Sequence, residues 1–221
     1  MVIKVRGKDL FPRLTNHLAL TYMTLISVMK SVVLANAAYS VFLMINNGNL
    51  NMTTATFWLA SFLSMILIYQ AFTIGVIIIA WIPTVRDILL PFAVGITEFL
   101  MFSVLTDPNT LVHWHLMFSL FSVAAFFAIW NVIRETKLSN YERSLHALVN
   151  KYITSQKTDR IMAFLTAIVW LVIWIVMQSF PSLQQYQWIS GVAAVAIMLV
   201  AIYFDEHDRH LIAQGIMENT N

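Results

Sequence analysis

Residues 111–133 read LVHWHLMFSLFSVAAFFAIWNVI and contain no aspartate, glutamate, lysine or arginine. A run of about 20 apolar residues is long enough to cross the hydrocarbon core of a bilayer as an α-helix. The whole chain agrees with this stretch, because 59% of its 221 residues are hydrophobic and only 11% are charged. Soluble globular proteins usually carry about 25% charged residues. The sequence therefore predicts an all-α, polytopic integral membrane protein.

Five more segments are apolar enough to cross, which predicts about six transmembrane helices. Their expected ranges, with the first stretch included, are 20–45, 54–82, 88–106, 111–133, 161–180 and 187–204. The third and sixth are short for a span, whereas the first two are long enough to tilt or to project past the lipid. The start of the first segment fits an interfacial helix equally well, because its apolar residues follow helical spacing.

Basic residues orient these spans. Lysines and arginines lie before the first span, between the second and third, between the fourth and fifth, and after the sixth. The loops 46–53, 107–110 and 181–186 contain none. The positive-inside rule then places both termini in the cytosol, and we expect the protein in a bacterial inner membrane.

This topology divides the chain into alternating membrane and cytosolic parts. The expected parts are a cytosolic N-terminal segment 1–16, a four-span unit 17–133, a cytosolic amphipathic helical segment 134–160, a two-span hairpin 161–204 and a cytosolic tail 205–221.

The segment 134–160 carries an apolar stripe. Its members recur every three or four residues, the period of one helix face: Leu138, Tyr141, Leu145, Leu148, Val149 and Tyr152. A helix of this length is marginal alone and needs a cover for its stripe. Lipid headgroups, the inner ends of the spans or a protein partner would each provide one, and the stripe is our candidate docking surface for a partner.

Polar residues inside the spans are the best pointers to function, because burying them in lipid is costly. Counting about 1.5 Å per residue from each outer span end predicts two polar layers. Glu98, Ser119 and Ser64 form the upper layer, and Lys30 and Gln70 form the lower one. They are the candidate ion or proton site. The alternative is that Glu98 is a protonated packing group bonded to Ser119 or to a backbone carbonyl.

Lys30 and Glu98 come out roughly 10 Å apart along the membrane normal by this count. That offset argues against direct contact between their side chains in straight helices. Lysine side chains reach toward the nearest interface when they can. We therefore expect Lys30 to extend to the cytosolic surface.

Four histidines are weak candidates for a metal site. His113 and His115 differ by about 200° around a helix, so they point to opposite sides. His207 and His210 share a helix face, but they stand where a charged stop follows the last span. Interfacial hydrogen bonding is the favoured interpretation, and no cofactor is predicted.

The remaining inventory narrows the functional classes. There is no cysteine, so disulfides and thiolate chemistry are excluded. Nucleophile elbows, phosphate loops, HExxH motifs, TVGYG-like filters and voltage-sensor arginine arrays do not occur. The sequence leaves open whether the protein is an enzyme but favours a non-enzymatic function. We expect no nucleic-acid partner.

Three functions fit this inventory. The favoured one is a non-enzymatic membrane subunit, an anchor or sensor for a cytosolic partner, for example in a bacterial defence or signalling system; that example is an analogy of architecture. The second is a small oligomeric ion channel or transporter that uses Glu98. The third is a subunit of a membrane metalloenzyme. For all three functions we expect the protein to lie in the bilayer and to assemble as a homo-oligomer or within a membrane complex.

Overall fold

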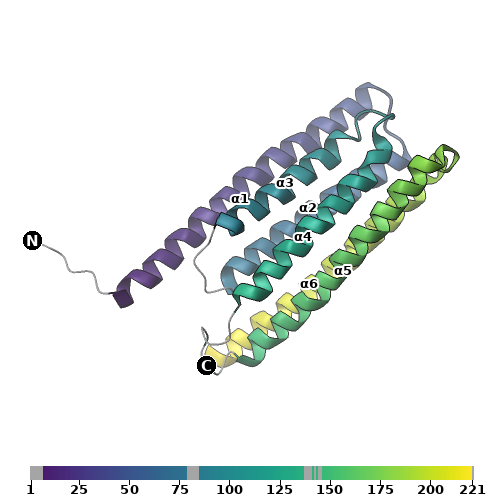
Figure 1. Cartoon of the computed structure of the whole chain (residues 1–221). Coiled ribbons are helices and arrows are strands. Elements are labelled where there is room, and N and C mark those ends of the chain that lie inside the picture. The colour runs from purple at the N-terminus through teal and green to yellow at the C-terminus, as the bar shows by residue number, and fades with distance from the viewer. Residues whose placement is uncertain (1–6, 79–84, 137–140, 142, 144–145, 221) are drawn as a thin grey trace, which may run out of the picture.

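The apolar segments form long helices that lie side by side (Figure 1). The computed structural model describes the backbone of residues 7–78, 85–136, 141, 143 and 146–220, and side chains within 20–75 and 88–206 of those ranges. The helices are α1 (Gly7–Asn46), α2 (Met52–Ile78), α3 (Val85–Ser103), α4 (Trp114–Glu135), α5 (His146–Ser179) and α6 (Gln187–Thr220). Short 3₁₀ turns, Leu111–His113 and Pro181–Tyr186, precede α4 and α6.

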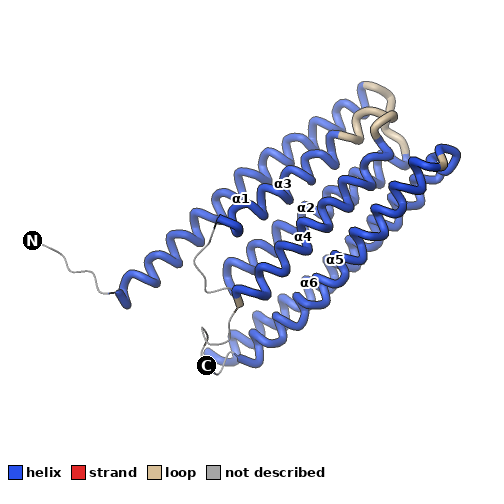
Figure 2. The backbone as a smooth tube through the Cα atoms, viewed as in Figure 1, coloured by secondary structure: helices blue, strands red, loops and turns tan. Residues whose placement is uncertain are grey.

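The helices form a ring of neighbours. α3 packs between α1 and α4, α5 lies along α4, and α2 lies along both α1 and α6. The loops that follow α1, α3 and α5 gather at one end of the bundle, as Figure 2 shows. α1 begins and α6 ends at the opposite end. The start of α1 and the end of α6 therefore lie at the same end of the bundle.

The all-helical membrane prediction is confirmed, and the described residues contain no strand. Five helices are long and apolar enough to cross a bilayer. The expected third span corresponds to α3, whose described side chains form a shorter apolar helix, Ile88–Ser103. Residues 104–106, which we expected to be helical, belong to the loop that leads to α4.

The segment between the fourth and fifth spans differs from expectation. α5 begins at His146 and continues without a break to Ser179, so residues 146–160 belong to the same helix as the predicted fifth span. No proline or glycine interrupts this stretch, and nothing local therefore separates an interfacial helix from the span. A distinct amphipathic helix is not formed within residues 146–160.

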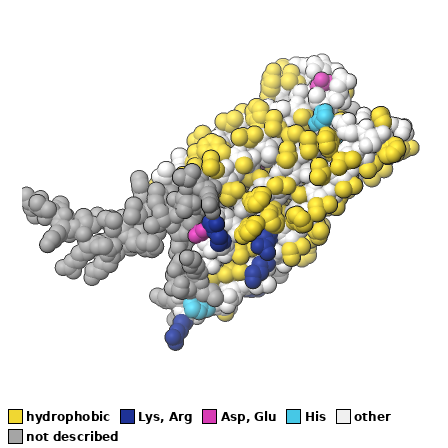
Figure 3. Space-filling view, in the orientation of Figure 1, with side chains coloured by type: hydrophobic (Ala, Val, Ile, Leu, Met, Phe, Trp, Pro, Cys, Tyr) yellow, Lys and Arg dark blue, Asp and Glu magenta, His cyan; other side chains and the backbone are white. Residues whose placement is uncertain are grey.

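Aromatic side chains fill the centre of the bundle. Trp114 stacks on Phe57 with ring centroids 4.3 Å apart and on Phe118 at 4.8 Å. Trp170 of α5 meets both Trp114 and Phe118 edge-on. Large apolar side chains also cover much of the outer surface, which appears yellow in Figure 3. An apolar core together with an apolar exterior is the pattern of a protein surrounded by lipid.

Candidate functional site

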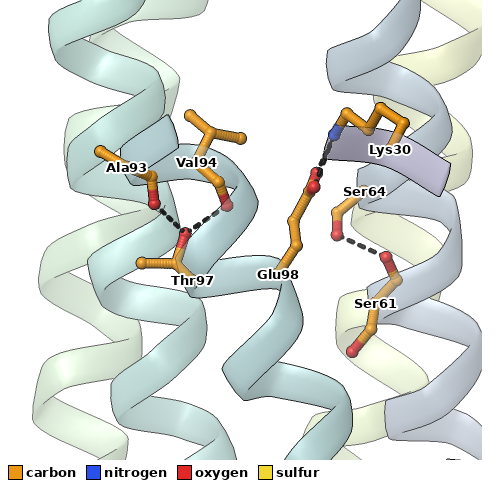
Figure 4. A network of polar contacts seen from close by, with 7 residues as sticks. All are labelled: Lys30, Ser61, Ser64, Ala93, Val94, Thr97 and Glu98. Carbon is orange, nitrogen blue, oxygen red and sulfur yellow. Dashed lines mark hydrogen bonds and ion pairs between the residues drawn. The ribbon is translucent and has the colours of Figure 1, made fainter. Parts of the chain in front are cut away.

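Lys30 of α1 and Glu98 of α3 form a buried ion pair (Figure 4). The Lys30 Nζ lies 2.5 Å from each carboxylate oxygen of Glu98. The Glu98 side chain is fully buried, and that of Lys30 is 10% exposed. One residue of each polar layer predicted from the sequence is therefore in this pair. The expectation that Lys30 extends to the cytosolic surface was wrong.

The error came from counting depth from the outer end of each span. Asn36 of α1 donates a 2.8 Å hydrogen bond to the Phe99 carbonyl and a 3.2 Å bond to Ser103 Oγ. Asn36 thus stands level with the end of α3, while α1 continues for ten more residues to Asn46. That is about 15 Å of extra helix. The outer ends do not lie in one plane, so the predicted offset was not real.

A glycine brings the two helices together beside the pair. Gly95 lies three residues before Glu98, on the same face of α3. A Cβ placed on Gly95 would lie 3.0 Å from the terminal methyl of Met29, the neighbour of Lys30. Small residues let membrane helices approach closely. Gly95 therefore helps to place α1 within reach of Glu98.

The pair is neutral as a whole, but each charge depends on the other. Removing an ion from water costs several kcal/mol, and attraction to its partner offsets that cost only when the geometry is good. Contact with both carboxylate oxygens is such a geometry. Loss of either charge would leave the other uncompensated in a buried position. The arrangement can therefore respond to a proton or a cation that reaches Glu98.

The serines of the predicted upper layer bond elsewhere. Ser119 Oγ donates to the Ala167 carbonyl at 2.8 Å, and Ser64 Oγ donates to the Ser61 carbonyl at 2.8 Å. Ser119 thus ties α4 to α5, and the expected Glu98–Ser119 hydrogen bond is replaced by the lysine contact. Gln70 is half-buried on α2.

The two histidines at the start of α4 contact different helices. His115 is buried, with Nε2 2.8 Å from Ser190 Oγ of α6 and Nδ1 3.1 Å from the Val112 carbonyl. His113 Nδ1 accepts a 3.3 Å hydrogen bond from Trp174 Nε1 of α5. Within the described side chains no three histidine or acidic residues are placed to bind a metal. The side chains of His207 and His210 lie outside the described residues.

The predicted docking stripe is partly covered by the chain itself at the four of its residues that the structure describes. Val149 and Tyr152 are buried, and Tyr141 and Leu148 are half-buried. Leu138 and Leu145 lie outside the described residues. A partner on this stripe would therefore meet only part of the predicted surface.

Comparison with protein-family models, curated proteins and solved structures found no match.

Asn36 and Gly95 are the site residues that the sequence did not single out. Asparagine in an apolar helix is a signal, because its amide needs partners in lipid. A glycine inside a span is a weaker one, since small residues are common at membrane helix contacts.

Proposed function

We propose that the protein is a small ion-translocating membrane protein in which the Lys30–Glu98 pair is the site opened by a proton or a small cation. The observation that supports this proposal is the buried contact of one ammonium group with both oxygens of one carboxylate. Ionisable residues inside membranes are rare and mark proton relays and ion paths. A buried ion pair is also weak evidence for a purely stabilising role, because apolar packing often serves as well.

The proposed cycle follows from charge balance. A proton or cation that binds Glu98 neutralises the carboxylate and releases Lys30 as an uncompensated cation. Lys30 then gains by reaching toward water, and its long side chain permits this. Movement of α1 against α3 would couple the arrival of the ion to a change of access. In this proposal Asn36, bonded to Phe99 and Ser103, is the fixed point of that movement.

Proteoliposome flux tests the proposal. Purified protein is reconstituted with a proton-, sodium- or potassium-sensitive dye inside, and the flux of the matching ion is driven by its own gradient at fixed membrane potential. We expect a flux above that of protein-free vesicles, and we expect Glu98→Gln to reduce it at least tenfold, because a neutral amide can neither take up a proton nor compensate a bound cation.

The matched control is Ser119→Ala, which removes a buried hydrogen bond on α4 without touching the pair. It should keep most of the flux. Transport by Glu98→Gln at the rate of the unmodified chain would refute the proposal, and so would the absence of any flux in the unmodified protein.

The anchor or sensor function is a second proposal. Its support is the continuous extension of α5 through residues 146–160, which gives a partner a rigid element to bind. A captured cytosolic partner that is lost with Leu148→Asp, and retained with Lys151→Gln, would favour this role. We also propose a bacterial inner-membrane location with both termini inside, and assembly as a homo-oligomer.

A further inference from the structure

The outward face of α4 and α5 carries a cluster of aromatic side chains. Phe126 of α4 has ring contacts with Trp130 and with Phe164 of α5, each at 5.7 Å between centroids. Phe127 stacks on Trp130 at 6.2 Å. Phe127, Trp130 and Phe164 are 48%, 47% and 51% exposed. The cluster, called the aromatic seam here, joins the two helices on the outside of the bundle and consists of Phe126, Phe127, Trp130 and Phe164.

Cations lie on the same face, all to one side of the seam. Arg134 follows Trp130 by four residues, while Arg160 and Lys157 precede Phe164 by four and seven. Residues four or seven apart share a helix face. α4 and α5 run antiparallel, so all three cations lie roughly 6–10 Å from the seam toward the end of the bundle where α6 finishes. Arg134 and Lys157 are exposed, and Arg160 is half-buried.

Acidic residues nearby leave this face positive. Glu135 accepts hydrogen bonds from Arg134 at 2.7 and 3.0 Å and balances that charge. Asp159 is bonded to Gln156 at 3.3 Å, and it stands about 100° around α5 from its neighbour Arg160. Lys157 and Arg160 therefore remain as two cations beside an apolar surface. Figure 3 shows basic side chains where the yellow surface ends.

We propose that this face binds an anionic phospholipid, with its acyl chains on the aromatic seam and its phosphate at Lys157 and Arg160. Toward the end of the bundle where α6 finishes, the aromatic seam is followed by the cations, just as the acyl chains of such a lipid are followed by its phosphate. Anionic lipids are concentrated in the cytoplasmic leaflet, and the positive-inside rule assigns this end of the bundle to that leaflet. The inference is independent of the Lys30–Glu98 site.

Fluorescence quenching in nanodiscs tests the site. The Trp130 signal is taken as the difference between the unmodified chain and Trp130→Phe. Its quenching by dibrominated phosphatidylglycerol is compared with quenching by dibrominated phosphatidylcholine at equal mole fraction. Each cation near an anionic surface contributes a factor of about five in affinity, so we expect a preference for phosphatidylglycerol of about fivefold or more.

Two variants and one control separate a specific site from general attraction. Lys157→Gln with Arg160→Gln should bring the preference to about one, while Lys157→Arg with Arg160→Lys should retain it. Lys151→Gln removes one positive charge from an exposed position on another face of α5 and should change little.

Three outcomes would overturn the inference. One is equal quenching by both lipids in the unmodified chain. Another is a loss of preference in Lys151→Gln as large as that in Lys157→Gln with Arg160→Gln, which would indicate diffuse attraction by the whole basic end. The third is shielding of Trp130 from both lipids in discs that hold two copies by mass photometry, which would assign the face to a second copy of the chain.

Discussion

At the scale of single residues, the energetics of the Lys30–Glu98 pair give a prediction about stability. Truncating one partner of a buried pair costs about 3–5 kcal/mol, whereas replacing both by apolar residues is often close to neutral. Lys30→Met should therefore lower the unfolding temperature in detergent clearly. Lys30→Met combined with Glu98→Met should recover most of the loss. Equal destabilisation by the single and double variants would contradict the mutual dependence of the two charges.

The same pair shows what a sequence reveals about a residue. Glu98 could be found from the sequence because a carboxylate in an apolar run is costly wherever it lies. Its partner could not, because contact depends on how far α1 slides along α3. The hydrogen bonds of Asn36 and the close approach at Gly95 determine that position, and both arise only once the helices have packed.

At the scale of helices, the contact between α2 and α6 is the tightest at any described glycine. A Cβ added at Gly191 would lie 2.2 Å from Thr56 Oγ1 and 2.9 Å from Thr56 Cβ. Overpacking of a close contact typically costs about 1–3 kcal/mol. Gly191→Ala should lower the unfolding temperature, and Ala196→Leu on an exposed position of the same helix should not. Equal stability of both variants would mean that α2 and α6 separate easily.

Helix composition predicted five of the six spans well but misjudged two helix limits. The pattern of apolar residues gives the existence of a helix, while its end depends on capping and neighbours. Thr110 Oγ1 donates to the Val104 and Asp107 carbonyls, which holds the turn after α3 and ends that helix early. The segment 134–160 was predicted to contain a separate amphipathic helix because its apolar residues follow helical spacing, but that spacing does not show where the helix ends, and α5 runs on from His146 to Ser179.

At the scale of the whole molecule, the arrangement of the loops predicts which residues face each compartment. Asn109 is exposed in the loop after α3, and Arg143 is exposed at the opposite end, just before α5. The chain contains no cysteine, so a single introduced thiol reports its own position. We expect a membrane-impermeant maleimide to label Asn109→Cys in intact spheroplasts and Arg143→Cys only after lysis, because the basic end is retained inside. Labelling of Arg143→Cys before lysis would reverse the orientation. It would also place the proposed phospholipid face in the outer leaflet and so remove the leaflet argument for an anionic lipid at that face.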